Sequence, residues 1–261
     1  MATLANIKHL VIDMDGVLYR GEQPMPKLQE FFAFLRSKPI SFILATNNST
    51  RTPRQYAEKL ARMGVEVSPS EVLHSGQAAA RVVARRFGRG ARVHVFGMPS
   101  LREAVQAEGL ILAEEHVQAV IASMDREVTY EKVKLATKLI RNGAVFYATN
   151  LDPTVPTDEG LIPGTGSMIA MLRTASETEP IVVGKPEPTM YQLAMEQMGA
   201  QPFATAAIGD RLDTDILGGQ RAGLTTICVL SGSSSRAEAE AFAPDFIFED
   251  IADLLAYWQR L

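Results

Sequence analysis

The chain alternates short apolar runs with longer amphipathic segments along most of its length. Short runs rich in β-branched residues predict strands, and apolar residues recurring every three or four positions predict helices. This alternation is typical of an α/β fold with a parallel sheet covered by helices. The predicted strands cover residues 9–13, 40–46, 92–97, 117–123, 144–150, 180–185, 204–210 and 224–230, and the predicted helices cover residues 29–37, 53–64, 130–143, 189–200 and 250–261.

Length, charge and cysteine content limit the class of protein. The 261 residues lie near the size at which one core splits into two domains, and the net charge of -4 favours neither a nucleic-acid surface nor a polybasic membrane patch. Cys228, the one cysteine, lies in a β-branched run and is interpreted as a core residue. Since no apolar run approaches the roughly 20 residues of a membrane span, and no signal-peptide core is seen, we expect a cytoplasmic location.

The first predicted strand runs into the sequence "DMDG", which contains Asp13 and Asp15. Ligands of open α/β sheets collect beyond the carboxyl ends of the strands. Two neighbouring carboxylates there need a cation, or a proton held by one of them, and hard oxygen ligands suit magnesium. The alternative of equal weight is that both aspartates form a turn before Gly16.

The second predicted strand ends in "TNNST", which supplies Thr46, Asn47 and Asn48. Hydroxyl, amide and backbone N–H groups at a strand end can form a cradle for an anion. Ser49 can instead cap the helix that follows, and the two roles are compatible. This segment is therefore a candidate phosphate-binding loop.

Two later strand ends add a cation and more carboxylates. Lys185 follows "IVVG", and Pro186 ends the predicted strand there. The Lys185 ammonium suits phosphate, although a lone lysine at a strand end is usually solvated. "GDRLDTD" supplies Asp210 as a further metal-ligand candidate, with Asp215 as a carboxylate that could also cap the next helix. The four strand ends together are far more specific than any one of them.

In these motifs the sequence resembles the haloacid dehalogenase superfamily of phosphohydrolases, whose four motifs look like "DMDG", "TNNS", "GKP" and "GDRLDTD" here. The long gap between the second and third motifs resembles subfamily IIA, the NagD-like and nitrophenylphosphatase-like enzymes with a large C2-type cap. The run "ATNLDPTVPTDEGLIPGTGSMIAML" resembles that subfamily's passage from cap to core. The resemblance implies a Rossmann-like doubly wound core of residues 1–78 and 180–261, with an inserted α/β cap domain at 79–179.

The resemblance also implies roles for the aspartates. Asp13 matches the nucleophile that forms an aspartyl-phosphate, and Asp15 matches the general acid–base that serves both steps. Asp13, Asp15 and Asp210 match the residues that hold Mg²⁺, with Asp15 binding through its backbone carbonyl. Asp215 matches a supporting carboxylate.

The remaining roles concern the phosphoryl group. Thr46, Asn47 and Asn48 match the phosphate-holding motif, and Lys185 matches the cation that offsets charge on the nucleophile and the phosphoryl group. Phosphoryl transfer needs mainly positioning and charge stabilisation, which this set of residues supplies.

We therefore expect Mg²⁺-dependent hydrolysis of small phosphomonoesters. A phosphotransferase or mutase of the same superfamily and a non-catalytic module that binds phosphorylated ligands are the alternatives. The expected partner is a small phosphorylated metabolite, with no nucleic acid and no membrane, and a homodimer is one open oligomeric state.

Several other features carry weaker hypotheses. The cap segments at residues 124–126 and 150–152 are candidates for choosing the substrate, although Asp125 and Arg126 fit a solvated turn slightly better. "PGTGS" at 163–167 is interpreted as a helix N-cap or hinge. The four histidines, at positions 9, 74, 94 and 116, show no metal-ligand spacing.

Overall fold

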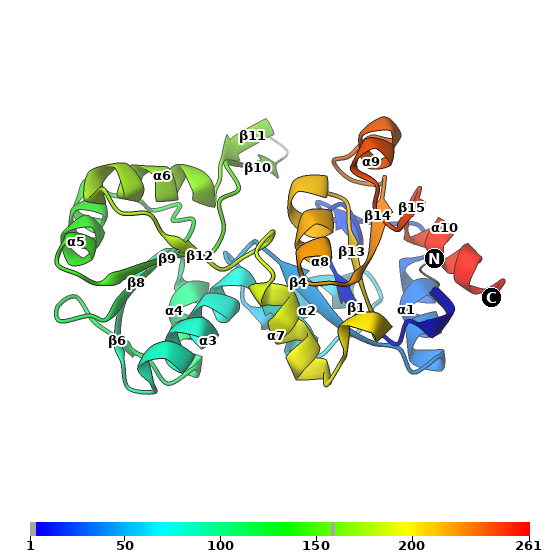
Figure 1. The fold of residues 1–261 in the computed structure, drawn as a ribbon, viewed down its shortest axis with the longest axis horizontal. Helices are drawn as coiled ribbons and strands as arrows, with labels where there is room; N and C mark the ends of the chain where they lie inside the picture. The colour runs from blue at the N-terminus through cyan, green and yellow to red at the C-terminus, as the bar shows by residue number, and fades with distance from the viewer. Residues whose placement is uncertain (1–3, 158–159) are drawn as a thin grey trace. The chain divides into compact units, whose positions relative to one another are not determined.

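The computed structural model describes residues 4–157 and 160–261 (Figure 1). The chain forms two compact units. The first unit comprises Met1–Thr46, Pro53–Leu73 and Lys185–Leu261, and the second unit comprises Asn47–Thr52 and His74–Gly184. The second unit is thus inserted into the first and extends further than the predicted cap at 79–179.

A six-stranded sheet forms the centre of the first unit. The pairs from β15 through β14, β13 and β1 to β4 are all parallel, and β5 follows β4 at the edge. The predicted α/β class is confirmed. In sheet order the strands are β15 (Phe246–Phe248), β14 (Thr225–Val229), β13 (Thr205–Gly209), β1 (His9–Ile12), β4 (Ser41–Thr46) and β5 (Val72–His74).

Alternate residues of these strands face opposite sides of the sheet. On one side, Ile12 and its neighbours pack against helices that include α1 (Leu28–Ser37), α2 (Pro53–Arg62) and α10 (Ile251–Trp258). On the other side lie α7 (Thr189–Met198), which packs on β1 and β4, and α8 (Leu217–Arg221), which packs on β14 (Figure 1).

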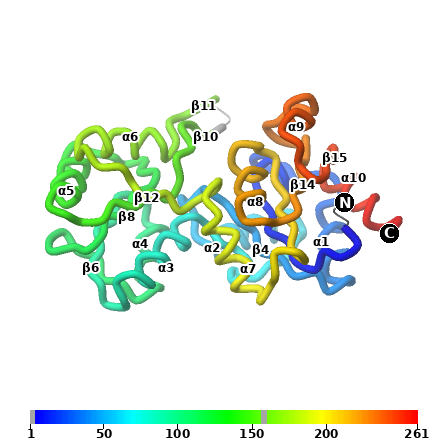
Figure 2. The backbone as a smooth tube through the Cα atoms, viewed as in Figure 1, coloured from blue at the N-terminus to red at the C-terminus, as the bar shows by residue number. Residues whose placement is uncertain are grey.

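Both described ends of the chain lie in the first unit (Figure 2). The Trp258 indole N–H donates to the backbone oxygen of Leu4 at 3.3 Å, and its ring stacks on Phe31 with centroids 6.3 Å apart. Because these contacts join residues more than 200 positions apart, the first unit folds around an insertion.

The second unit contains a five-stranded parallel sheet with α3 (Ser75–Phe87) and α4 (Pro99–Ala107) on one face and α5 (Tyr130–Arg141) and α6 (Thr165–Ser176) on the other (Figure 1). Apolar residues of β6, β8 and β9 form one buried core with α5 and α6. In sheet order the strands are β12 (Ile181–Val182), β9 (Val145–Ala148), β8 (Ala119–Ala122), β6 (Arg92–Phe96) and β7 (Ile111–Leu112).

The predicted strand at 180–185 is present, but it belongs to the second sheet. Ile181 pairs with Tyr147 of β9 in parallel, so the strand extends the sheet of the second unit and the chain enters the first unit at Lys185. The predicted core boundary at residue 180 placed this strand in the other domain. An apolar run of this length predicts a strand but not its neighbour, since pairing is a long-range contact.

The glycine-rich segment at 163–167 starts a helix. Gly164 is the N-cap of α6, in agreement with the predicted capping role. A Cβ atom on Gly166 would lie 2.3 Å from the Leu151 backbone oxygen, so the close approach of two backbones requires glycine. The antiparallel pair β10 (Thr154–Thr157) and β11 (Gly160–Pro163) precedes the helix, and residues 158 and 159 of the predicted cap-to-core run lie outside the described residues.

None of the described helices combines the length and the apolar character that a membrane crossing requires.

Candidate active site

The carboxyl ends of β1, β4 and β13 meet at one edge of the first sheet, because the three strands are parallel neighbours. Asp13 follows β1 directly, and its backbone N–H donates to the oxygen of Ile208 on β13 at 2.9 Å. Asp210 follows β13 and is buried. The sheet therefore brings the first and fourth sequence motifs to the same edge.

Lys185 links three segments at this edge. Its buried Nζ donates to the Asp13 carboxylate, to Asp215 Oδ1 at 2.6 Å and to the Ala45 backbone oxygen at 2.9 Å. Ala45 precedes Thr46 at the end of β4. One ammonium thus holds the ends of β1 and β4 and the segment after β13 in place, and the charge-assisted hydrogen bonds are of the stronger kind.

Burial and neighbouring charges shift the pKa values of the cluster. Burial raises the pKa of Asp13 well above its usual value, and the Lys185 ammonium offsets part of that shift. Burial lowers the pKa of Lys185, but Asp13 and Asp215 outweigh it, so the net pKa lies well above the usual value. Burial, with the Asp215 charge, raises the pKa of Asp210 to about 6. Lys185 is therefore a permanent cation among groups that resist further negative charge.

Asp13, Asp210 and Asp215 form a group that could hold a metal ion. Each offers a carboxylate oxygen, and these oxygens all lie within 4.8 Å of one another. Three carboxylates exceed the single charge of Lys185, and a hard dication with oxygen ligands such as Mg²⁺ would offset the excess. The donor set fits magnesium, and Asp215, predicted as a supporting residue, lies in the group itself.

Asp15 differs from Asp13, since its side chain is exposed. It occupies a turn in which the Gly16 N–H donates to the Tyr19 backbone oxygen at 2.8 Å. Gly16 has φ of +83°, and a Cβ atom there would lie 2.7 Å from the Asp210 carboxylate. Glycine is thus required both for the turn and for the space beside Asp210.

The second motif is divided between the units. Thr46 ends β4 in the first unit, whereas Asn47 begins a short segment of the second unit. The Asn47 amide donates to Asp152 Oδ2 at 3.1 Å, and the Asn47 backbone oxygen accepts from Asn150 Nδ2 at 2.7 Å and Ser75 Oγ at 2.6 Å. Residues 150 and 152, predicted to choose the substrate, are therefore neighbours of the predicted phosphate loop.

Asn48 and Ser49 both make local hydrogen bonds within the second unit. Asn48 Oδ1 accepts from the Thr50 backbone N–H at 3.0 Å and from the Thr50 hydroxyl at 2.7 Å, which is an Asx-type turn. Ser49 Oγ lies 2.6 Å from Ser123 Oγ, and Thr149 also donates to Ser123 at 2.8 Å. These bonds give the loop a defined shape.

The predicted cap turn at 124–126 has a structural explanation. The buried Asp125 carboxylate accepts from Lys132 Nζ at 2.9 Å and from the Glu127 backbone N–H at 2.9 Å, while Arg126 is exposed. The solvated-turn interpretation thus holds for Arg126, and Asp125 anchors the turn to α5.

Sequence reasoning missed the contacts made by the segment after β14. The serines there form a loop, and α9 (Arg236–Phe242) begins after the N-cap Ser235. The same loop also donates hydrogen bonds to Asp210. A run of small residues at the carboxyl end of a strand in the active sheet is the signal that could have indicated this.

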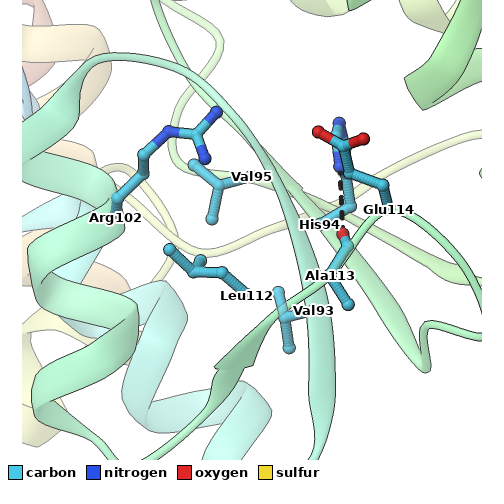
Figure 3. Close-up of a pocket in the computed structure, with 7 residues that line it drawn as sticks. All are labelled: Val93, His94, Val95, Arg102, Leu112, Ala113 and Glu114. Carbon is cyan, nitrogen blue, oxygen red and sulfur yellow. Dashed lines mark hydrogen bonds between the residues drawn. The ribbon is translucent and has the colours of Figure 1, made fainter.

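Figure 3 shows a separate pocket in the second unit. Arg102 reaches into it from α4, and His94 Nδ1 lies 3.3 Å from the Ala113 backbone oxygen. Burial is the main cause that lowers the pKa of His94, so the ring is neutral near pH 7. None of the predicted site residues lines this pocket.

Residues 10–111 match the family model for haloacid dehalogenase-like hydrolases, and residues 182–254 match a second model of HAD-hydrolase-like proteins. An acid sugar phosphatase of Staphylococcus aureus is 36% identical over 256 residues, covering 97% of this chain and 98% of its own. The chain belongs to the haloacid dehalogenase superfamily. The predicted NagD-like, subfamily IIA resemblance is confirmed, and the protein is a phosphatase of this superfamily.

Solved structures agree with this assignment. The 4-nitrophenylphosphatase of Thermotoga maritima superposes with a TM-score of 0.91 at 34% identity, covering 96% of this chain and 97% of the other. A glycerol phosphate phosphatase of Mycobacterium tuberculosis, solved in complex with magnesium, superposes with a TM-score of 0.90 at 34% identity. The match covers 97% of this chain and 78% of the other.

Proposed function

We propose that this phosphatase hydrolyses small phosphomonoesters with Mg²⁺ through an aspartyl-phosphate intermediate. The observation that carries the proposal is the buried contact of Lys185 with Asp13 and Asp215, beside Asp210. A carboxylate that is 12% exposed and paired with one fixed cation at a strand end suits an attacking group, because its position is set before the substrate arrives.

In the first step an Asp13 carboxylate oxygen attacks phosphorus, and the bond between phosphorus and the ester oxygen breaks. Asp15, in its carboxylic acid form, donates its proton to the leaving oxygen. In the second step the Asp15 carboxylate takes a proton from water, whose oxygen attacks the aspartyl-phosphate. Inorganic phosphate leaves and the Asp13 carboxylate is restored. The exposure of Asp15 supports this role, because the acid must meet both the leaving group and water.

Charge stabilisation would come from two sources. Lys185 lies against Asp13 and would offset negative charge on the phosphoryl group as the new bond forms. Asp13, Asp210 and the Asp15 backbone carbonyl, with Asp215 close by, would hold Mg²⁺, which when bound supplies positive charge to the phosphoryl oxygens. Thr46, at the end of β4, would donate a hydrogen bond to those oxygens. Asn47 and Asn48 stay predicted phosphate ligands from the sequence.

The relatives support a small phosphorylated metabolite as the substrate. They are named as an acid sugar phosphatase and a glycerol phosphate phosphatase, and both names describe small phosphate esters. The cytoplasmic location and the homodimer stay predictions from the sequence.

The decisive experiment is Asp13→Asn, which removes the nucleophile's charge at nearly constant volume. We expect turnover of p-nitrophenyl phosphate with Mg²⁺ to fall by at least about 10³-fold. Asp213→Asn is the matched control, since Asp213 lies in the fourth motif but is 73% exposed. Magnesium-dependent turnover that persists in Asp13→Asn would contradict the mechanism.

Product analysis separates the alternatives. With a panel of phosphomonoesters and alcohol acceptors, hydrolysis releases inorganic phosphate and alcohol in equal amounts. Phosphorylated acceptor would instead indicate a phosphotransferase. A phosphate ester that binds tightly and stays uncleaved with Mg²⁺ would indicate a binding module.

A further inference from the structure

The segment after β14 has the sequence "SGSS" at residues 231–234, which we call the serine loop. Its four residues contact Asp210 or the turn that follows Asp13. We propose that the serine loop is a positioning element that holds the Asp210 carboxylate in the orientation needed for metal binding. This inference rests on the proposed function, in which Asp210 is a metal ligand.

The serine loop holds Asp210 at both its side chain and its backbone. The Ser233 backbone N–H donates to Asp210 Oδ2 at 2.8 Å, and the Ser234 hydroxyl donates to the Asp210 backbone oxygen at 2.7 Å. Asp210 is 3% exposed, so water competes little with these bonds. Two anchors on one residue restrict both the position of its backbone and the rotation of its carboxylate.

Gly232 allows the loop to come this close. A Cβ atom at Gly232 would lie 2.0 Å from Asp210 Oδ2 and 2.4 Å from Asp210 Cβ, and both distances are steric clashes. A Cβ atom at Gly16 would lie 2.7 Å from the same carboxylate. The Asp210 carboxylate therefore lies against two glycine backbones, and its position depends on the absence of both side chains.

The serine loop also contacts the turn that carries Asp15. The buried Ser231 hydroxyl donates to the Gly16 backbone oxygen at 2.7 Å, and the Ser231 backbone oxygen accepts from Arg20 Nε at 2.6 Å. Arg20 belongs to β2 (Tyr19–Arg20), which pairs with β3 (Gln23–Pro24). The loop thus connects Asp210 with the segment just after Asp13.

These contacts go to a carboxylate and a turn rather than to the apolar core, which distinguishes the loop from an ordinary connection. Hydrogen bonds that orient metal ligands typically change metal affinity by 10–100-fold when they are removed. The loop is therefore expected to act on the affinity for Mg²⁺ more than on the stability of the fold.

The test measures Mg²⁺ binding directly by isothermal titration calorimetry on the full chain, together with the Tm without metal. We expect Ser234→Ala to raise the Kd for Mg²⁺ about 10-fold and Gly232→Ala about 100-fold, within the range for such partners. Ser234→Thr keeps the hydroxyl and should restore the wild-type Kd. At saturating Mg²⁺, Ser234→Ala should recover most of its kcat, because the attacking group is unchanged.

Ser235→Ala is the matched control. Ser235 is the next residue, but its hydroxyl caps α9 by accepting from the Glu238 N–H at 3.4 Å, and among the described residues it forms no hydrogen bond with Asp210. It should lower the Tm slightly and leave the Kd for Mg²⁺ unchanged. If the loop only stabilised the segment in general, Ser234→Ala and Ser235→Ala would both lower the Tm and would have the same Kd for Mg²⁺. That result would contradict the inference.

The outcomes separate this inference from the proposed function. Wild-type Mg²⁺ binding and turnover with an unchanged Kd in Ser234→Ala and Gly232→Ala would overturn the inference alone. A raised Kd in these variants, in a protein that binds Mg²⁺ without turnover, would support the inference and contradict the function. Absence of Mg²⁺ binding in the wild type would overturn both. If Gly232→Ala fails to fold, Ser234→Ala and Ser234→Thr decide the matter.

Discussion

Two buried polar regions of this protein are built from different chemistry. In the first unit, the charged cluster consists of Asp13, Asp210, Asp215 and Lys185. In the second unit, the hydroxyl network consists of Ser49, Ser123 and Thr149, which are neutral and hydrogen-bonded to one another. Both regions are removed from water, but only the first contains charges.

The difference indicates what each region is for. Burying a neutral hydroxyl costs little free energy when the hydroxyl forms a hydrogen bond, so a network of this kind can simply stabilise a loop. Buried charges are costly even when paired, and a protein gains no stability over an apolar core by keeping them. The charged cluster is therefore explained by chemistry, and perturbed pKa values such as that of Asp210, about 6, are typical of such sites.

The largest expected effect comes from removing the cation of the charged cluster. Lys185→Met leaves the buried Asp215 and the half-buried Asp13 without their cationic partner, which should lower the free energy of unfolding by about 3–5 kcal/mol. It should also abolish most phosphatase activity. Urea denaturation at pH 7 measures the stability change.

A matched lysine tests the comparison. Lys132→Met in the second unit breaks one ion pair, with Asp125, but Lys132 is 38% exposed and Asp125 keeps the Glu127 N–H. The expected loss is about 1 kcal/mol. Equal losses in the two variants would contradict the distinction between the two lysines.

A smaller effect concerns a buried histidine of the second unit. His74 Nδ1 accepts from the N–H groups of Gly76 at 3.1 Å and Gln77 at 3.3 Å, and burial, with Arg81, lowers its pKa to about 3. The unfolded chain binds the proton near pH 6.5, so this group costs stability as the pH falls below 6.5 toward 3. The cost at pH 5 is about 2 kcal/mol.

The variant His74→Asn isolates this contribution. Asparagine is also a strong N-cap, so the helix start is kept while the titrating group is removed. The midpoint of urea denaturation should fall between pH 8 and pH 5 in both proteins, and the fall should be smaller in the variant than in the wild type. An identical fall in both proteins would show that His74 does not sense pH.

The smallest effect is expected in the hydroxyl network itself. Ser123→Ala removes the shared partner of Ser49 and Thr149, and the loss should be about 1 kcal/mol in the free energy of unfolding. Ser167→Ala is the control, since this serine is exposed and bonded to Pro153 O at 2.9 Å. A loss in Ser123→Ala above that of Lys185→Met would reverse the comparison.

Much of the fold could be predicted from local patterns. The eight predicted strands all appear, because β-branched apolar runs bounded by polar residues depend on local chemistry. Five strands of only two or three residues were missed, since so short a run has no readable period: β2, β3, β5, β7 and β15. The four-residue pair β10 and β11 was missed as well. Helices α3 and α4 were also missed, and α6 was predicted only through the helix N-cap at residues 163–167. Both α3 and α6 are rich in small residues that weaken the apolar spacing.

The sequence by itself determined the residue types at the strand ends, and hence the family and the set of candidate site residues. Tertiary structure alone decided three things: that the strand before Lys185 joins the second sheet, that Asp215 lies within the carboxylate group, and that the serine loop holds Asp210. The physical reason is the range of the interactions. Periodicity and turn chemistry act over a few residues, whereas strand pairing and hydrogen bonds between loops join positions that only the folded chain brings together.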